Sequence, residues 1–229
     1  MGAAPARPPR RRATGVPDIP GNRPHRHRRD RAARAPRPAG RRLTVFSRQP
    51  KEAAVQEPHK PWAVVPDVIS DADQLIATYS SQLEDKTGQA SAGETRIVDG
   101  KRIFDPGLER DLQRGFDEAA KVTGIEYTAI EGVTILRYPS GGEYSWHADN
   151  ELVPGLGDTR KLSMVVALNT EFEGGGTEIM WPRPGFSEKI SLPPGDALIF
   201  PSFLYHRGCV TTAGERWIIV AWAEGAPFR

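Results

Sequence analysis

A change of hydrophobic period near residue 133 is the feature that most constrains the fold of this chain. From Val133 onward, apolar and polar residues alternate in short runs separated by glycine, proline or aspartate. A period of two is typical of strands that bury one face. The pattern predicts short strands near residues 133–138, 143–147, 162–168, 177–181, 187–192, 197–200 and 216–223. So many short strands favour an antiparallel sandwich or barrel, the architecture of a jelly roll.

Two helices are expected before these strands. Apolar residues between Leu75 and Leu83 recur at helical spacing, and the stretch Ser70–Asp73 offers an N-cap, which predicts a helix over about 71–84. Asp105 followed by Pro106 is a typical helix start, and Gly124 is expected to end the second helix. Short strands are expected at 62–65 and 95–98, with residues 88–100 otherwise loop-like. The fold class is therefore mainly β with flanking α-helices.

Charge divides the chain into two unlike parts. Residues 1–50 hold 14 arginines and two aspartates, which leaves 17 basic and 27 acidic residues, a formal charge of −10, for residues 51–229. Nine prolines and few apolar residues in the first part predict disorder. We expect a disordered basic Arg/Pro-rich extension at 1–58 and a folded domain at 59–229, with a helical part at 67–124 and a β-core at 130–225. The extension is either an incidental solvated tail, a targeting peptide or an arm for nucleic acid.

The cellular compartment is predicted from cysteine usage and hydropathy. Cys209 is the only cysteine, so no intrachain disulfide can form and a reducing compartment is favoured. No run of 18 apolar residues and no secretory signal is found in the sequence. We therefore expect a cytoplasmic protein that does not associate with membranes.

Three residues are candidate metal ligands. His147 and Asp149 form a His-x-Asp pair, and on a strand their side chains would point to the same face. His206 follows the turn at Gly195–Asp196 and a short apolar strand, which would bring it to the mouth of the sandwich. Two histidines and one carboxylate that leave open coordination positions are typical of non-haem Fe(II) oxygenases.

Two further residues are candidates for binding an anionic ligand. Arg216 lies ten residues after His206 and opens an otherwise apolar strand, where a buried guanidinium needs an anion. A bound dicarboxylate would supply that anion; the alternative, a surface arginine at a strand entry, is disfavoured by the spacing from His206. Tyr138 ends the strand that precedes His147, and its hydroxyl can face the same pocket. Weaker candidates for the pocket rim are Trp146, Glu151, Arg160 and Trp222.

Taken together, these residues resemble the prolyl 4-hydroxylase-like branch of the Fe(II)/2-oxoglutarate-dependent dioxygenases over about residues 62–225. The matching motifs are Tyr138…Gly141-Gly142-x-Tyr144…His147-x-Asp149, Arg160…Leu168, Glu173-Gly-Gly-Gly-Thr177, Gly195-Asp196-Ala, and His206…Gly214-Glu-Arg216-Trp217…Trp222. The resemblance implies a double-stranded β-helix (jelly-roll, cupin-like) core in which His147, Asp149 and His206 are the catalytic residues and hold Fe(II). It also implies that Arg216 and Tyr138 bind 2-oxoglutarate, and it leaves open ascorbate as a further cofactor.

The resemblance implies a hydroxylase that uses O2 and 2-oxoglutarate and releases succinate and CO2. The substrate is left open among a small molecule, an amino acid and a peptide, and so is the oligomeric state. Collagen-type members of the family have lysine where this chain has Arg216, which weakens a collagen assignment. Glu151 is similar to a residue of the nucleic-acid demethylase branch, but a domain of charge −10 disfavours phosphate backbones. Another alternative is a catalytically silent metal-binding jelly-roll module, which would have no reason to place Arg216 and Tyr138 at these spacings.

Overall fold

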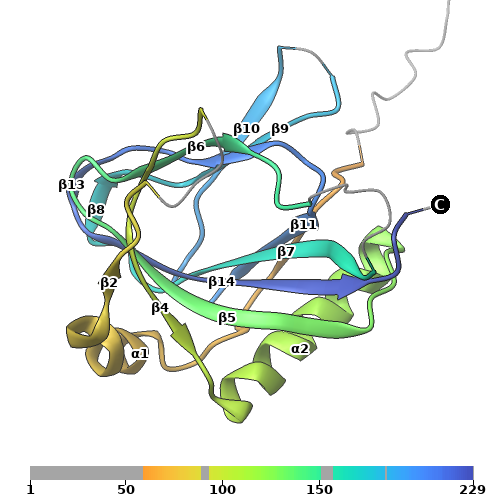
Figure 1. Ribbon diagram of the computed structural model, residues 1–229, viewed down its shortest axis with the longest axis horizontal. Coiled ribbons are helices and arrows are strands. Elements are labelled where there is room, and N and C mark those ends of the chain that lie inside the picture. Colours follow the sequence, from red (N-terminus) through yellow and green to blue (C-terminus); the bar gives the residue numbers. More distant parts are fainter. Residues whose placement is uncertain (1–58, 89–92, 151–156, 184, 229) are drawn as a thin grey trace, which may run out of the picture. The chain divides into compact units, whose positions relative to one another are not determined.

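The computed structural model describes residues 59–88, 93–150, 157–183 and 185–228 (Figure 1). The described elements are, in chain order, β1 (Ala63–Val65), α1 (Ala72–Tyr79), the 3-10 helix η1 (Ser80–Gln82), β2 (Glu84–Asp85), β3 (Arg96–Ile97), β4 (Asp99–Ile103), α2 (Pro106–Thr123), β5 (Ala129–Tyr138), β6 (Glu143–His147), β7 (Thr159–Ala167), β8 (Phe172–Gly174), β9 (Thr177–Met180), β10 (Ser187–Ile190), β11 (Ala197–Pro201), β12 (His206–Gly208), β13 (Thr211–Gly214) and β14 (Arg216–Gly225).

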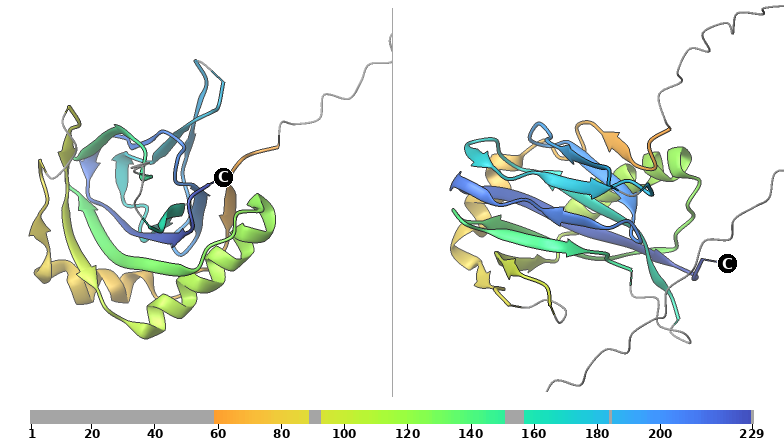
Figure 2. Two further views of the ribbon diagram at one scale, coloured as in Figure 1. Left: turned by 45° about the vertical axis from the view of Figure 1, so that its right-hand side comes forward. Right: turned by 90° about the horizontal axis from the view of Figure 1, so that it is seen from above.

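Two antiparallel sheets face one another across the domain. The larger sheet has the order β1-β11-β7-β14-β5-β4-β2, and the smaller has the order β10-β9-β12-β6-β3. A two-stranded ribbon, β13-β8, joins them at one end. Figure 2 shows the two sheets curling around a common interior, with the helices outside the larger sheet. This arrangement confirms the predicted mainly β fold with a double-stranded β-helix core.

The central part of the larger sheet is covered on both faces. The interior between the sheets is filled by apolar side chains, among them Leu136, Leu198 and Phe200. On the outer face, α2 packs Leu112 and Phe116 against residues of the same strands. A sheet with apolar contacts on both faces is a rigid support. Side chains of β5, β7 and β14 that point into the interior are therefore held in fixed positions.

Helix α2 forms where the sequence predicts it, because both of its ends carry local signals. The Asp105 side chain accepts hydrogen bonds from the backbone N–H groups of Gly107 (2.7 Å) and Leu108 (3.2 Å). At the other end Gly124 takes a left-handed conformation (φ +69°) and donates its N–H to the Ala120 carbonyl. These are the capping interactions expected of a stable helix.

Other boundaries differ from the predictions. Helix α1 ends at Tyr79 and passes into η1, and its N-cap, Asp71, makes no side-chain capping bond, so the predicted cap and the extension to residue 84 are wrong. Strand β4 lies partly where a loop was expected and pairs with β5. Strand β3, predicted at 95–98, does form, at an edge of the smaller sheet. Within the part of the chain that the structure describes, no helix has the length and apolarity needed to span a membrane.

Candidate metal centre and co-substrate pocket

Strand pairing brings the two predicted histidines together. His206 on β12 lies directly opposite His147 on β6, and their ring centroids are 4.2 Å apart. The pairing then shifts register, so that Gly208 lies opposite Tyr144. Such a bulge re-aims the side chains on the bulged strand. Two residues 59 positions apart in sequence therefore point into one end of the interior.

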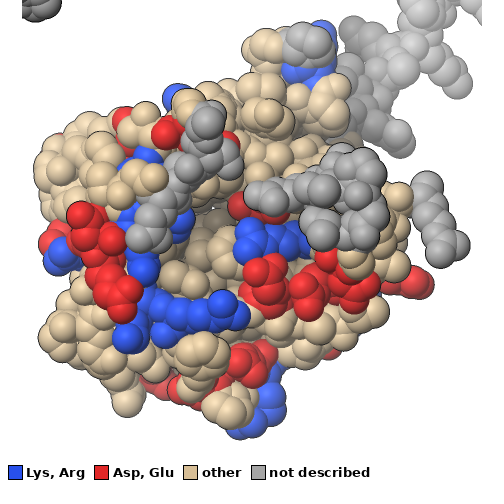
Figure 3. Space-filling model, viewed as in Figure 1, with Lys and Arg blue, Asp and Glu red and all other residues tan. Residues whose placement is uncertain are grey.

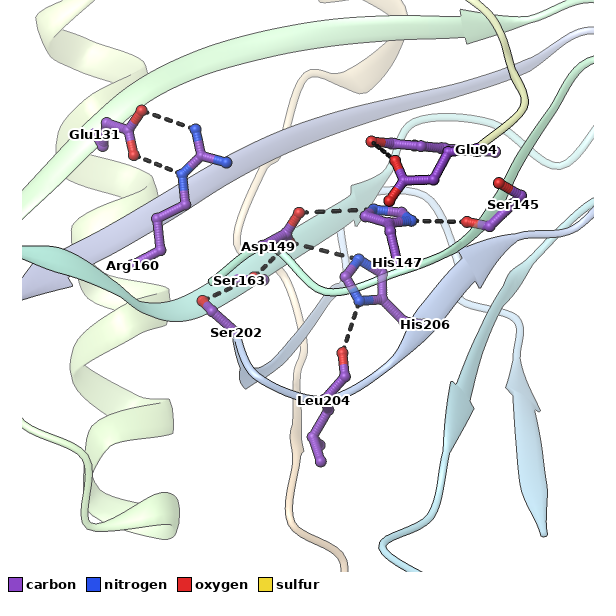
Figure 4. Close-up of polar contacts among 11 residues, drawn as sticks. Glu94, Glu131, Ser145, His147, Asp149, Arg160, Ser163, Ser202, Leu204 and His206 are labelled. Carbon is purple, nitrogen blue, oxygen red and sulfur yellow. Dashed lines mark hydrogen bonds and ion pairs between the residues drawn. The ribbon is translucent and has the colours of Figure 1, made fainter. Parts of the chain in front are cut away.

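Asp149 is positioned by a turn and not by a strand. Strand β6 ends at His147, so the expectation that both side chains share a strand face is wrong in detail. Instead the Asp149 N–H donates to the Ser202 carbonyl (3.0 Å), which folds the carboxylate back toward the histidines. The carboxylate oxygens lie 3.6 Å from Nε2 of His147 and 3.4 Å from Nε2 of His206 (Figure 4). The predicted triad is thus assembled, with candidate ligand atoms all within 4.8 Å of one another.

Hydrogen bonds fix the orientation and the tautomer of the two histidines. Nδ1 of His147 lies 2.8 Å from the Ser145 carbonyl, and Nδ1 of His206 lies 2.9 Å from the Leu204 carbonyl (Figure 4). A carbonyl only accepts, so each Nδ1 carries the proton and each Nε2 keeps its lone pair for a metal ion. Burial, and then the neighbouring His206, lower the pKa of His147 to about 4, which keeps this ligand neutral.

The Asp149 carboxylate is held in its charged form. Burial acts to raise the pKa of Asp149, but the two imidazoles and the hydrogen bond from Ser163 outweigh it and lower the pKa. The Ser163 hydroxyl donates to Asp149 over 2.6 Å and lies 2.9 Å from the Ser202 hydroxyl. Two imidazoles and one buried carboxylate are the donor set that suits ferrous iron. The sequence carried no sign of the two supporting serines.

Arg216 is buried beside the same cavity. It opens β14 directly opposite Tyr138, the last residue of β5, and it is only 5% exposed. One terminal nitrogen, Nη2, donates to the Thr177 hydroxyl (2.9 Å), whereas Nη1 has no hydrogen-bond partner among the described residues. A buried cation with an unsatisfied donor is costly unless an anion completes it. Burial accordingly lowers the pKa of Arg216.

One cavity connects this arginine to the metal ligands. It is lined by His147, Asp149, His206, Tyr138, Thr177 and Arg216, together with apolar residues of β5, β7 and β14. The Tyr138 ring lies 5.3 Å from the Arg216 guanidinium, and burial raises the pKa of Tyr138, which keeps its hydroxyl protonated. A dicarboxylate with one end at the triad and the other at Arg216 therefore fits the residues present.

Tyr144, a motif residue to which the sequence assigned no role, and Arg96, which the sequence did not single out, extend the site. The Tyr144 ring stacks on the His147 imidazole with centroids 3.7 Å apart and an interplanar angle of 16°. The Arg96 guanidinium lies over the Tyr144 ring, 5.1 Å from its centroid. In a regular strand, residues 144 and 147 would point to opposite faces. The bulge in β6 places them together, and a bulge cannot be deduced from spacing alone.

Of the weaker candidates for the pocket rim, some lie at the cavity and others do not. Arg160 donates to both carboxylate oxygens of Glu131 (2.6 and 2.8 Å) and lies 3.9 Å over the Trp222 ring, close to the cavity that Trp222 lines. Trp146 instead packs against Arg207, 4.9 Å from its guanidinium, and does not line the cavity. Glu151 lies outside the described residues.

A double-stranded β-helix that carries two histidines and one aspartate around an open position defines the class of mononuclear non-haem iron oxygenases. The comparisons with known proteins agree. The model of the 2OG-Fe(II) oxygenase superfamily matches residues 133–224. Among solved structures, the fold is similar to a viral collagen prolyl hydroxylase from Paramecium Bursaria Chlorella virus-1 (20% identity, TM-score 0.56, 73% of this chain and 97% of that one). A Pseudomonas putida prolyl-4-hydroxylase gives the same TM-score at 19% identity, over 73% and 94% of the two chains.

Curated relatives narrow the class. A PKHD-type hydroxylase of Thermosynechococcus vestitus is 31% identical over 160 residues, which is 69% of this chain and 67% of the relative. A PKHD-type hydroxylase of a Synechococcus strain is 26% identical over 161 residues, 66% of this chain and 72% of that one. The chain belongs to the 2OG-Fe(II) oxygenase superfamily, in its PKHD-type, prolyl 4-hydroxylase-like branch, and is a 2-oxoglutarate-dependent dioxygenase. Fe(II), held by His147, Asp149 and His206, and 2-oxoglutarate are its predicted and now confirmed cofactors; a role for ascorbate stays a prediction.

Proposed function

We propose that Arg216 and Tyr138 bind the distal carboxylate of 2-oxoglutarate, and that the enzyme hydroxylates a prolyl residue of a peptide. The observation that carries the first part is the buried Nη1 of Arg216, which has no hydrogen-bond partner among the described residues and borders the cavity that also holds the triad. An Arg–carboxylate contact is bidentate and charge-assisted, so it both satisfies Nη1 and orients the ligand. The Tyr138 hydroxyl, kept protonated by burial, is available as a further donor.

The protein's own residues supply position and a dry environment. When bound, Fe(II) would catalyse the reaction in which 2-oxoglutarate, O2 and a substrate C–H bond give succinate, CO2 and the hydroxylated product. The Ser145 and Leu204 carbonyls orient the two imidazoles, and Ser163 holds the carboxylate. Apolar residues of β5 and β14, including Leu136 and Ile218, line the space between triad and Arg216. This lining excludes water from the space where the co-substrate reacts.

The prolyl target is supported by the similar structures. Two of them are named as prolyl hydroxylases, and a third, from Trichoplax adhaerens, is described as a prolyl hydroxylase in complex with a peptide fragment of the hypoxia-inducible factor oxygen degradation domain (18% identity, TM-score 0.55). At these low sequence identities, the similarity to this chain shows a shared fold and nothing about the substrate. A prolyl peptide is therefore the first substrate to test, ahead of free amino acids and other small molecules.

The test uses the full chain reconstituted with Fe(II). Succinate formed from 2-oxoglutarate is measured with and without proline-containing peptides, and each peptide is examined by mass spectrometry for the addition of one oxygen atom. We expect peptide-dependent succinate and one hydroxyl per peptide, both lost in His206→Ala because that variant no longer holds iron. Succinate without any hydroxylated peptide would contradict the prolyl target alone. Absence of succinate from an iron-loaded protein would favour a silent metal-binding module.

A further inference from the structure

A second concavity opens beside the metal site. It is lined by Glu84, Lys86, Arg96, Lys101, Arg102, Phe104, Glu131, Gly132, Thr134, Arg160 and Trp222, which we call the basic groove. Arg96 and Trp222 also line the cavity that holds the triad, so the basic groove adjoins that cavity. Figure 3 shows a hollow on this face of the molecule with Lys and Arg side chains along its rim. Anything bound along the groove would extend from the reacting position.

The charge of the basic groove is opposite to that of the chain around it. Residues 51–229 carry a formal charge of −10, yet the groove contributes five cationic side chains against two carboxylates. Two of the cations are balanced, Arg160 by Glu131 and Lys86 by Glu84. Lys101 and Arg102 have no carboxylate within ion-pair distance among the described residues. Cations gathered in a concave site of an otherwise acidic chain favour an anionic ligand.

Arg102 is an exposed residue of the groove that such a ligand can contact. Its guanidinium lies 5.5 Å from the Phe104 ring, which is 79% exposed. It also covers Gly132 of β5, whose backbone has φ +55°: a Cβ there would lie 2.6 Å from Nη2 of Arg102. The glycine thus lets the guanidinium lie close against the sheet, while no carboxylate among the described residues neutralises it. Because this exposed guanidinium has no carboxylate partner among the described residues, an anionic ligand can contact it without first breaking an ion pair.

The extent of the basic groove matches a peptide. Most of its residues lie on or next to β7, β14, β5, β4 and β2, which are five consecutive strands of the larger sheet, while Arg96 lies on β3 of the smaller sheet. With strands about 4.8 Å apart, four steps cover roughly 19 Å, and an extended peptide needs about five or six residues for that length. The carboxylates of Glu84 and Glu131 interrupt the groove, which suits a chain with discrete charges better than a continuous phosphate backbone.

We propose that the basic groove binds acidic side chains that neighbour the hydroxylated residue, so that the enzyme selects acidic peptide segments. This inference rests on the proposed function, because it names the peptide class that the metal site would act on. Arg102 is its main contact and Phe104 supplies an apolar surface beside that contact. Arg96 stands where the groove meets the metal cavity.

Direct binding tests this without turnover. Three fluorescein-labelled nonapeptides share a central proline and carry Glu, Gln or Lys at two positions on each side. Their affinities for the full chain, loaded anaerobically with Fe(II) and 2-oxoglutarate, are measured by fluorescence anisotropy at low and high salt. We expect the Glu peptide to bind about tenfold more tightly than the Gln peptide at low salt, with the Lys peptide weakest, and the difference to shrink in salt.

Variants at two positions, Arg102 and Arg183, separate the basic groove from general charge. Arg183 is the matched control, since it too is exposed and lies 4.3 Å from an exposed phenylalanine, Phe186, but it stands outside the groove. Arg102→Glu should weaken Glu-peptide binding by about tenfold and leave Gln-peptide binding unchanged, Arg102→Gln should lie between, and Arg183→Glu should change binding by less than about twofold. Because the arginine-rich residues 1–50 are present in every variant, their contribution cancels in this comparison.

Several results would overturn the inference. Equal affinity for the Glu and Gln peptides, or equal losses in Arg102→Glu and Arg183→Glu, would show that the groove does not select acidic peptides. Binding of a labelled oligothymidine that depends on Arg102, in place of peptide binding, would assign the groove to nucleic acid. The visible absorption of the Fe(II)–2-oxoglutarate chelate is recorded alongside: if the chelate forms and the peptide preference is absent, only this inference fails. If the chelate itself does not form, the proposed function fails.

Discussion

Replacing Arg216 by methionine tests the co-substrate site most directly. Arg216 is 5% exposed, Nη2 donates to Thr177, and Nη1 has no hydrogen-bond partner among the described residues. Methionine keeps much of the length and apolar volume but removes the charge and all five donors. The structure then predicts two effects of opposite sign, one on the ligand-free protein and one on the complex.

In the ligand-free protein the variant should be no less stable than the parent. A buried guanidinium without an anion loses its hydration and gains little in return, and replacing buried charges by apolar residues is often neutral or stabilising by about 1–4 kcal/mol. The lowered pKa of Arg216 has the same cause, which is burial. We therefore expect the free energy of unfolding of Arg216→Met to be unchanged or to rise by about 1–2 kcal/mol, after the loss of the Thr177 hydrogen bond is deducted.

The complex should lose most of its affinity. A hydrogen bond to a charged group contributes about 1.5–3 kcal/mol, so two bonds from the guanidinium to a carboxylate contribute about 3–6 kcal/mol. Since about 1.4 kcal/mol corresponds to a factor of ten, the dissociation constant of 2-oxoglutarate should rise by about 10²–10⁴. Iron binding should persist, because none of the three metal ligands is changed.

Two measurements follow both effects. Anaerobic titration of the Fe(II)-loaded protein with 2-oxoglutarate gives the dissociation constant from the visible absorption of the chelate. Thermal unfolding gives the stability, and 2-oxoglutarate at 100 times its dissociation constant should stabilise the parent by about 2.7 kcal/mol but leave the variant almost unaffected. Arg137→Met is the matched control, because Arg137 lies on the same sheet but is paired with Asp99 and does not line the cavity. That control should lose up to about 1 kcal/mol of stability and keep its affinity.

Effects of the opposite sign would contradict a role for Arg216 in binding 2-oxoglutarate. An Arg216→Met protein that binds 2-oxoglutarate as tightly as the parent would show that the guanidinium does not contact the ligand. A ligand-free variant that unfolds several kcal/mol more easily would show that Arg216 holds β14 and β9 together through Thr177 and has no need of an anion.

Three further predictions concern the support of the site. Ser163→Ala removes the hydroxyl that donates to Asp149 and should weaken Fe(II) affinity by about tenfold in an anaerobic metal titration, whereas an unchanged affinity would mean that Ser163 only fills space. Because folding lowers the pKa of His147 to about 4 from the ordinary 6.5, the unfolded chain binds a proton that the folded metal-free chain does not, and stability should fall by about 3 kcal/mol as the pH drops from 6.5 to 4. Chemical denaturation at several pH values measures this, and in His147→Gln the fall should be smaller. Asp105→Ala removes the cap of α2 and should cost about 1 kcal/mol, seen as a melting temperature lower by about 2–4 °C, and no change would mean that water replaces the cap.

Local signals account for what the sequence predicted correctly. Helix α2 carries Asp105–Pro106 at one end and Gly124 at the other, so its bounds could be read without knowledge of its partners. Strand β6 alternates polar and aromatic residues, and β14 is a nearly continuous apolar run, as is typical of a strand covered on both faces. The predicted span of 143–147 coincides with β6, and Arg216 begins β14 as expected.

The errors arose where a partner strand decides the conformation. Strand β4 contains Asp99, Gly100, Lys101 and Arg102, a sequence with low strand propensity, and it extends because β5 supplies its hydrogen bonds on one side and β2 on the other. Asp149 was expected on a strand, but the Ser202 carbonyl bends the chain at that point. In both cases the deciding residues belong to other segments of the chain: β2 and β5 for β4, and Ser202, 53 positions later, for Asp149.

The same distinction explains why the metal ligands could be predicted while the basic groove could not. His147, Asp149 and His206 belong to residue types whose combination is rare and chemically specific, so their presence indicates a site before any contact is known. Lysines and arginines are common, and those of the groove are scattered between residues 86 and 160 among more numerous acids. Only the fold places them side by side, four on or next to strands of the larger sheet and Arg96 on β3 of the smaller sheet. A formal charge of −10 for residues 51–229 therefore describes the average surface and does not exclude anionic substrates, because a substrate meets only the strands that border the metal centre.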